Sequence, residues 1–142
     1  MDCYNYNRAS FKPKHINECQ IGDIVRIKQD EFAPADLLLL NAAAPNESVM
    51  IDTSYVNGQR GLLKKKVAGW NIKFDSDADL QTFQGQIETQ KSFNWDEQLW
   101  TADFTFQMRD RGEKIKLGVD QHSYIPNGSF LRDTDYAIGI IV

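Results

Sequence analysis

Short alternating or continuous apolar runs, rather than helical periodicity, dominate the hydrophobic pattern of this chain. Ile24–Ile27 alternates after a Gly-Asp turn, which predicts a half-buried strand. The four leucines Leu37–Leu40 predict a fully buried strand, because Asn41 and Pro45 leave too little room for a helix. Runs of this kind, separated by Gly, Pro, Asn and Asp, are typical of a β-sandwich or barrel.

The remaining apolar runs extend this pattern along the chain. The clearest alternation is Leu99–Met108, where one face carries Trp100, Phe104, Phe106 and Met108 and is more typical of a core than of a ligand stack. Further strands are predicted at Ser48–Asp52, Asn71–Phe74, Phe83–Ile87, Ile115–Leu117 and Tyr136–Val142, and a short helix at Ser76–Thr82. Eight or nine such strands predict a mainly β fold: a distorted jelly roll or double-stranded β-helix-like sandwich with one or two short helices.

Thr53–Gly69 is a long, polar and basic segment between two predicted strands. Asn57-Gly58 within it marks a turn, because both residues tolerate positive φ. It also contains Lys64-Lys65-Lys66, although three adjacent lysines are more often a solvated surface than a binding site. Loops of this length in compact domains are usually functional or mobile, so this segment is the first candidate for a functional site.

Length and composition fit one globular domain. The 142 residues are 42% hydrophobic and 25% charged, and the net charge of −4 argues against nucleic acid as a partner. No window approaches the ~18 apolar residues of a membrane helix, so direct membrane insertion is not expected. The N-terminus lacks the basic start and apolar stretch of a secretory signal. Residues 1–14 are predicted to be a flexible segment and residues 15–142 the β domain, which we expect to be a fragment of a larger protein because its last residues are apolar.

Familiar catalytic and metal-binding patterns are missing from the sequence. It has no glycine-rich phosphate loop, no persuasive carboxylate pair and no Ser-His-Asp arrangement. Cys3 and Cys19 lack metal-like spacing and predict two reduced thiols rather than a disulfide. His15 and His122 have no partner at ligand spacing, so no metal site is predicted. The acidic alternation at Asp75–Asp79 lacks the glycine and the distal glutamate of a calcium loop.

Five strings in the chain do follow a recognisable order. They are Ile21–Val25, Pro34–Leu40, Ile51–Leu62, Phe83–Ile87 and Gly128–Tyr136, the last with Gly139 beyond it. In this order they resemble the actuator domain of P-type ATPases, and the four-leucine string resembles the phospholipid-transporting, or flippase, class in particular. The resemblance covers residues 15–142.

The resemblance implies a function that depends on other domains. In this family the actuator domain lies at the cytosolic face of the membrane and rotates as the pump cycles. Its Asp-Gly-Glu-Thr loop reaches a phosphorylated aspartate in another domain, where the glutamate positions and deprotonates water. The implied partners are therefore the phosphorylation domain and the membrane helices of the same parent chain, together with an accessory subunit. ATP and Mg²⁺ would bind the parent elsewhere, no cofactor is expected in this segment, and alone it is not expected to be an ATPase.

The loop departs from the family pattern at three of four positions. It reads Asn57-Gly58-Gln59-Arg60, so only Gly58 is retained and Gln59 holds the place of the catalytic glutamate. A neutral amide accepts a hydrogen bond but takes up no proton at pH 7, while Arg60 and Lys64 are candidate phosphate contacts. Three alternatives follow: an inactive loop, a loop that holds a phosphoryl group without turning it over, or a slow site in which glutamine orients water.

A degenerate loop fits two settings in the family. Some protists fuse a flippase-like ATPase half to a guanylyl cyclase half, and a conventional, active flippase with an unusual loop is the alternative. Outside the family, an unrelated β-sandwich binding module is the further alternative. The actuator hypothesis makes a structural prediction: Gly58 lies at an exposed, projecting loop. The inactive-loop hypothesis adds that no acid such as Asp52 or Glu47 lies beside it.

Overall fold

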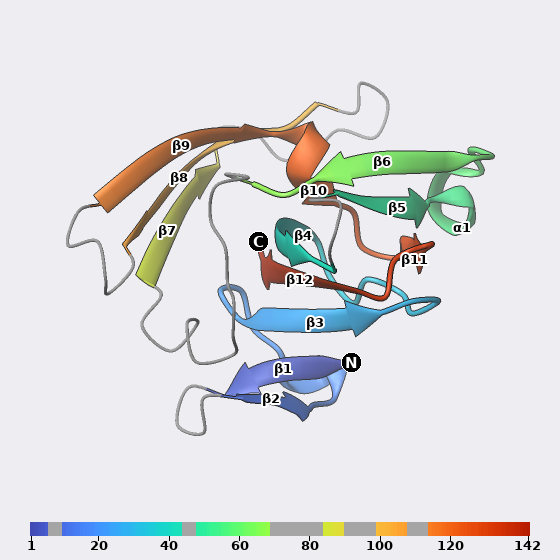
Figure 1. The fold of residues 1–142 in the computed structure, drawn as a ribbon, viewed down its shortest axis with the longest axis horizontal. Coiled ribbons are helices and arrows are strands. Elements are labelled where there is room, and N and C mark those ends of the chain that lie inside the picture. The colour runs from blue at the N-terminus through green and yellow to red at the C-terminus, as the bar shows by residue number, and fades with distance from the viewer. Residues whose placement is uncertain (6–9, 44–47, 69–83, 90–98, 108–113) are drawn as a thin grey trace.

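The computed structural model describes residues 1–5, 10–43, 48–68, 84–89, 99–107 and 114–142, which form three antiparallel sheets (Figure 1). The strands are β1 (Asp2–Asn5), β2 (Ser10–Pro13), β3 (Ile24–Lys28), β4 (Leu37–Ala42), β5 (Ser48–Asp52), β6 (Leu62–Lys66), β7 (Gln84–Thr89), β8 (Thr101–Gln107), β9 (Lys114–Asp120), β10 (Tyr124–Ile125), β11 (Phe130–Arg132) and β12 (Tyr136–Ile141). One α-helical turn, α1 (Ser54–Asn57), and two 3₁₀ turns, η1 (Ile16–Glu18) and η3 (Gln121–Ser123), complete the described elements. The predicted mainly β sandwich is confirmed.

The largest sheet explains why the four leucines are continuous in sequence. Its strand order is β10-β4-β12-β3-β1-β2, so β4 is an inner strand. Leu38 and Leu40 enter one hydrophobic cluster and Leu37 and Leu39 enter a second, which means that both faces of β4 are buried. A strand covered on both sides needs apolar residues at every position rather than at alternate ones. The prediction of a fully buried strand at Leu37–Leu40 is therefore confirmed.

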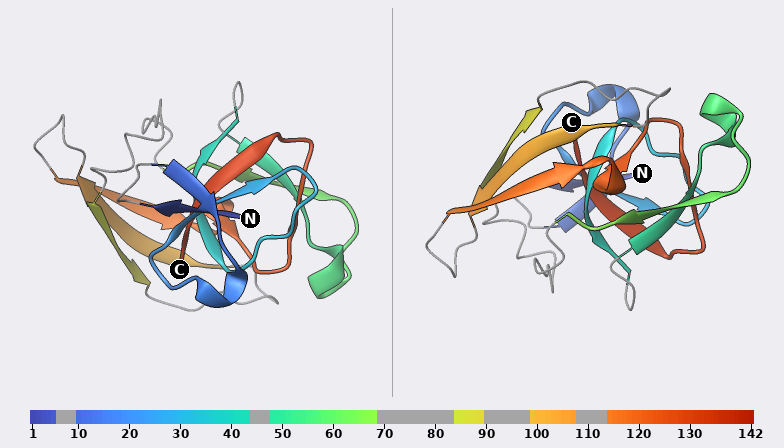
Figure 2. Two further views of the ribbon diagram at one scale, coloured as in Figure 1. Left: turned by 90° about the horizontal axis from the view of Figure 1, so that it is seen from below. Right: turned by 90° about the horizontal axis from the view of Figure 1, so that it is seen from above.

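The two smaller sheets cover these faces (Figures 1 and 2). The sheet β7-β8-β9 turns Trp100, Phe104 and Phe106 into the cluster that contains Leu38. Trp100, Phe104 and Phe106 of the predicted aromatic face are thus core, as expected, while Met108 lies outside the described residues. The sheet β11-β5-β6 contributes Ile51 and Leu131 to the cluster that contains Leu37.

Residues 1–5 and 10–14, the described part of the predicted flexible segment, contain two paired strands. Strands β1 and β2 pair as a hairpin, and β1 continues the large sheet through Asp2↔Arg26 and Cys3↔Val25. Tyr4 and Phe11 are buried and meet edge to face, with ring centroids 5.2 Å apart. Each strand has only four residues, which is too short for a hydrophobic alternation to be recognised.

Several other predictions have clear outcomes. Strand β6 lies inside the segment predicted to be a loop, and β9 is longer than the predicted Ile115–Leu117. The strand predicted at Asn71–Phe74, the helix at Ser76–Thr82 and the acidic alternation at Asp75–Asp79 lie outside the described residues. Among the described residues, no helix is long and apolar enough to cross a bilayer.

Candidate functional site

The candidate loop closes the hairpin of β5 and β6, which pair as far as Asp52↔Leu62. Residues 53–61 form the hairpin tip, and α1 lies at this outer end of the hairpin (Figure 1). Gly58 ends α1 in the left-handed conformation, with φ 69° and ψ 2°, and its amide donates to the Ser54 carbonyl at 2.9 Å. It is exposed, and a Cβ placed on it would meet nothing within 4 Å. Gly58 therefore lies at an exposed, projecting loop, as the actuator hypothesis predicts.

A local hydrogen-bond network connects the residues on either side of Gly58. Asn57 Oδ1 accepts from the Gln59 amide at 3.0 Å and from Thr53 Oγ1 at 3.2 Å. Asn57 Nδ2 donates to Gln59 Oε1 at 3.4 Å. Asn57 thereby holds both the backbone amide and the side-chain carboxamide of Gln59, while Gln59 stays exposed to solvent. Such an amide can direct a water molecule but has no basic atom with which to deprotonate it.

Two cations follow the network along the chain. Arg60 is exposed on the tip, and Lys64 is exposed on β6. Within the described ranges, no ion pair engages either side chain, so both charges are available to an anion. Lys65, by contrast, turns inward: Nζ donates to the Gln121 carbonyl at 2.7 Å, and burial lowers its pKa. Because side chains alternate along β6, Lys65 has a structural role, whereas its neighbour Lys64 is a candidate phosphate contact.

Asp52 directly precedes the tip and is the carboxylate closest to it in sequence. Asp52 Oδ1 accepts from the Ser54 amide at 2.9 Å, and Oδ2 lies 4.0 Å from Arg132 Nη2. The hydrogen bonds from Ser54, with a smaller contribution from Arg132, hold the pKa of Asp52 below its ordinary value. Residues 53–61 themselves contain no Asp or Glu, and Glu47 is outside the described residues. Asp52 is committed to starting α1 rather than to the space beside Gly58.

The pKa shift of Asp52 predicts how it contributes to stability. A carboxylate with a lowered folded-state pKa stabilises the fold above its ordinary pKa of 3.8, and this contribution is lost as the pH falls through the folded-state value. We expect Asp52→Asn to lower the free energy of unfolding at neutral pH, with a difference from wild type that shrinks below about pH 4. Urea unfolding across this pH range, with the exposed Asp135→Asn as control, measures it. A difference that does not vary with pH would contradict this role.

Three aromatic rings attach the tip to the body of the domain. Tyr55 of α1 lies 5.2 Å from Phe130 and 5.9 Å from Phe32, measured between ring centroids, and Phe32 and Phe130 are 3.6 Å apart. The guanidinium of Arg132 covers Phe130 at 4.6 Å. We call Phe32, Tyr55 and Phe130 the aromatic clamp. Sequence reasoning missed it because its members come from three separate segments with no common period.

Removal of the clamp's outer ring should loosen the tip. We expect Tyr55→Ala to lower the free energy of unfolding by about 0.5–1.5 kcal/mol, the usual contribution of an aromatic pair. Tyr55→Phe keeps the ring and should unfold like wild type. Equal losses in the two variants would mean that the hydroxyl, rather than ring packing, holds α1.

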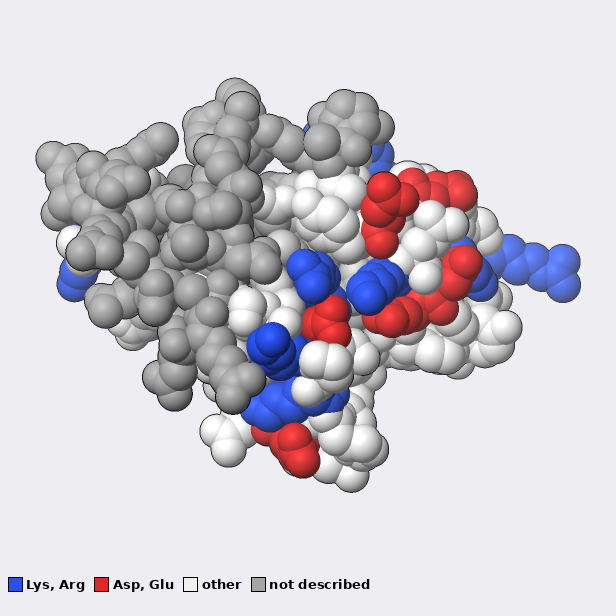
Figure 3. All heavy atoms as spheres, turned by 60° about the horizontal axis from the view of Figure 1, so that its bottom comes forward, with Lys and Arg blue, Asp and Glu red and all other residues white. Residues whose placement is uncertain are grey.

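Charge among the described residues on one further face of the domain is mixed. On the face drawn in Figure 3, basic and acidic side chains lie side by side. Arg26 pairs with Asp2 at 3.1 Å, and Lys14 pairs with Asp23 at 3.4 Å. The described residues of this face therefore form no continuous basic surface of the kind that a nucleic-acid partner requires.

Comparisons with known proteins identify relatives of one class. The chain is 28% identical over 140 residues to a phospholipid-transporting ATPase of Schizosaccharomyces pombe, covering 99% of this chain and 11% of the relative. It is 29% identical over 141 residues to human phospholipid-transporting ATPase IC, with the same 99% and 11% coverage. It is 30% identical over 123 residues to phospholipid-transporting ATPase 6 of Arabidopsis thaliana, covering 87% and 9%. No family model matches the chain.

These similarities confirm the resemblance to phospholipid-transporting P-type ATPases that the five strings carry. The chain spans about a tenth of the length of the curated relatives it matches. It is related to one segment of these proteins, and the alternative of an unrelated β-sandwich binding module loses its support.

Proposed function

We propose that this chain is the actuator domain of a flippase-like P-type ATPase and couples the phosphorylation state of its parent protein to movement of the membrane helices. The observation that carries the proposal is the exposed Gly58 on the outer end of the β5–β6 hairpin. It stands in a chain related over 99% of its length to phospholipid-transporting ATPases. A projecting loop of this kind can reach a phosphorylated residue in another domain.

The chemistry of the tip supports a catalytically impaired or regulatory role. Gln59 occupies the position of the proton-accepting glutamate, and no acidic residue lies within 53–61. Asp52 is engaged by Ser54 and Arg132 at the base of α1. Loss of a general base typically slows a reaction by about 10²–10⁴-fold, so hydrolysis of an aspartyl phosphate would be slow.

The cations of the tip support binding of the phosphoryl group. Arg60 and Lys64 are exposed and make no ion pair within the described residues. A guanidinium gives charge-assisted hydrogen bonds to phosphate oxygens, and a lysine adds a point charge. A tip that carries cations and no base would hold a phosphoryl group more readily than it would release it.

An active flippase is the second candidate, and the Asn57 network favours it. Asn57 donates to Gln59 Oε1 at 3.4 Å and accepts from the Gln59 amide at 3.0 Å, so the glutamine is oriented. An oriented glutamine directs the attacking water in some phosphate-hydrolysing proteins. In that case the parent would still dephosphorylate its aspartyl phosphate and transport phospholipid.

The parent protein supplies what this segment lacks. Its phosphorylation domain and membrane helices would be the partners of the tip, at the cytosolic face of the membrane, with an accessory subunit as a further partner. ATP and Mg²⁺ would bind in other domains of the parent. A fusion with a guanylyl cyclase is one setting that the degenerate loop fits.

Phosphoenzyme decay in the full-length parent tests the proposal. After labelling with ATP and a chase with unlabelled ATP, the impaired tip predicts a phosphoenzyme that outlasts that of a glutamate-containing flippase measured alongside. Wild-type decay as fast as that of the glutamate-containing flippase, together with slower decay in Gln59→Ala, would support the active flippase instead. Unaltered decay after deletion of the β5–β6 tip would mean that the tip neither holds the phosphoryl group nor turns it over.

A further inference from the structure

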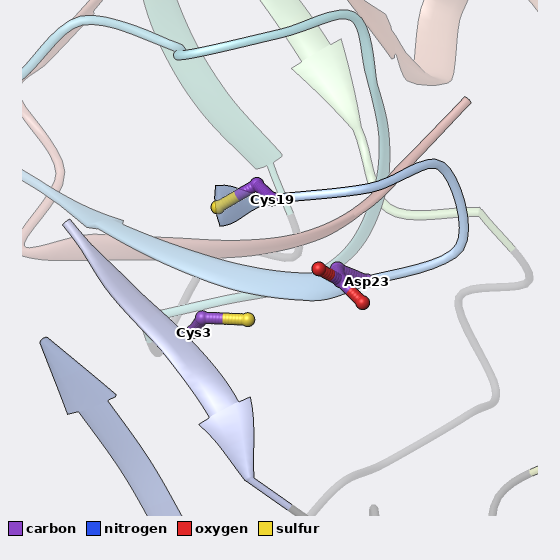
Figure 4. Close-up of side chains that lie close together, drawn as sticks. All are labelled: Cys3, Cys19 and Asp23. Atoms are coloured by element: carbon purple, nitrogen blue, oxygen red, sulfur yellow. The ribbon is translucent and has the colours of Figure 1, made fainter. Parts of the chain in front are cut away.

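Two thiols and a carboxylate from three segments come together beside the N-terminal hairpin (Figure 4). Cys3 lies on β1, Cys19 follows η1, and Asp23 comes directly before β3. The two Sγ atoms and a carboxylate oxygen of Asp23 all lie within 4.8 Å of one another. We propose that Cys3, Cys19 and Asp23 form a binding site for one thiophilic divalent metal ion, for which Zn²⁺ is the best match.

The donor set matches zinc chemistry. Zn²⁺ binds thiolate sulfur at about 2.3 Å and carboxylate oxygen at about 2.0–2.2 Å in a tetrahedral arrangement. These bond lengths bring the donor atoms to within about 4 Å of each other, so donors already inside 4.8 Å need only small side-chain adjustments. Three protein ligands leave a fourth position for water. Thiolate ligands also select against Mg²⁺ and Ca²⁺, which prefer oxygen.

The neighbouring residues balance the charge of such a site. Two thiolates and one carboxylate carry three negative charges, and Zn²⁺ together with the Lys14 ammonium supplies three positive charges. Lys14 Nζ lies 3.4 Å from Asp23 Oδ2, and the Gln20 amide donates to the same oxygen at 2.9 Å. The hydrogen bonds described for Asp23 therefore end at one carboxylate oxygen, Oδ2. Outer partners of this kind commonly orient a ligating carboxylate.

A disulfide is the alternative for this cluster, but it would involve only the two thiols. It would join Cys3 to Cys19 after oxidation, but Asp23 and Lys14 would have no part in it. Neither cysteine is in a disulfide: Cys3 Sγ donates to the Tyr4 carbonyl at 3.9 Å and Cys19 Sγ to the His15 carbonyl at 3.6 Å. Cys3 is buried at 6% exposure. The oriented carboxylate beside the two sulfurs therefore favours a metal ion.

A metal ion at this site would stabilise the pairing of β1 with β3. Strand β1 joins β3 through only two register pairs, Asp2↔Arg26 and Cys3↔Val25. An ion held by Cys3, Cys19 and Asp23 would fasten this short pairing to the turn that precedes β3. Because the ion would bind the folded chain far better than the unfolded one, it would raise the stability of the N-terminal hairpin. This inference does not depend on the function proposed for the tip.

Metal titration of the reduced 142-residue chain tests the site. Zn²⁺ in competition with a chromophoric chelator should bind at one ion per chain, and more tightly as the pH rises because the thiols release protons. Co²⁺ should show thiolate-to-metal absorption. Cys19→Ser and Asp23→Asn should each weaken binding, and Lys14→Met should weaken it by about 10-fold, as expected for an outer partner. Asp30→Asn, a carboxylate outside the cluster, should leave the affinity unchanged.

Several outcomes would overturn the site. Unchanged affinity in Cys19→Ser would do so, and so would wild-type binding no tighter than that of a Cys3→Ser/Cys19→Ser variant. A Cys3–Cys19 disulfide formed with hydrogen peroxide, in a chain whose reduced form binds no zinc, would assign the pair to redox chemistry instead. If Cys3→Ser fails to fold, the partly exposed Cys19 provides the same test: Zn²⁺ should raise the thermal midpoint of wild type and leave that of Cys19→Ser unchanged.

Discussion

Replacing Gln59 by glutamate in the full-length parent protein is expected to accelerate phosphoenzyme decay by about 10²–10⁴-fold, the usual contribution of a general base. The substitution places a carboxylate on the exposed tip, next to the left-handed Gly58. Gln59 and glutamate have nearly the same shape, so the Asn57 hydrogen bond to the Gln59 backbone amide should persist. The gain would therefore come from proton abstraction rather than from a rebuilt loop.

Two further variants separate chemistry from charge. Asn57→Asp adds a carboxylate two residues away and keeps the oxygen that accepts from the Gln59 amide, so it controls for negative charge on the tip. It should leave decay far slower than Gln59→Glu does. Gln59→Ala removes the amide and should change nothing if the tip is inactive. Fast wild-type decay that Gln59→Glu fails to increase would contradict the impaired-tip hypothesis.

The hydrophobic pattern alone predicted the strands that are buried on both faces or on one face. Leu37–Leu40 is continuous because β4 is covered on both faces, and Phe104 and Phe106 alternate because only one face of β8 enters the core. Each pattern reports directly on burial. The order of the family strings also predicted the position of the tip, because it placed Asn57-Gly58 on a loop.

Long-range pairing accounts for what the pattern could not predict. Phe32 and Phe130 are far apart in sequence, yet their ring centroids lie 3.6 Å apart because the bridge Phe32↔Phe130 joins their segments. Cys3 and Asp23 come together only because β1 pairs with β3. Strand β6 was predicted to be a loop because its lysines conceal an alternation that places Lys65 inward. A single sequence contains no record of which segments pair, so the clamp and the cysteine cluster required a structure.

Gly128→Ala is expected to be the most damaging of the stability variants and to act on the tip from outside it. Gly128 has φ +87°, and a Cβ there would lie 2.9 Å from Val56 Cγ2 on α1. Positive φ costs a non-glycine residue about 1–2 kcal/mol, and overpacking adds about 1–3 kcal/mol, so we expect the free energy of unfolding to fall by about 2–5 kcal/mol. Gly22→Ala, at φ +96° with nothing within 4 Å, carries the backbone cost alone. Equal losses in urea unfolding would mean that α1 simply moves aside.

A double variant isolates the contact between Gly128 and the tip. Val56 is 41% exposed, so Val56→Ala alone should cost little. Combined with Gly128→Ala it should remove the collision and recover the overpacking part of the loss, leaving the cost of positive φ. Recovery would show that the turn before β11 holds α1 against the domain, on the same side as the aromatic clamp that Phe130 shares with Tyr55. The projecting Gly58 would then be positioned by packing at the base of its helix, because the space around Gly58 itself is open, with nothing within 4 Å of a Cβ placed there.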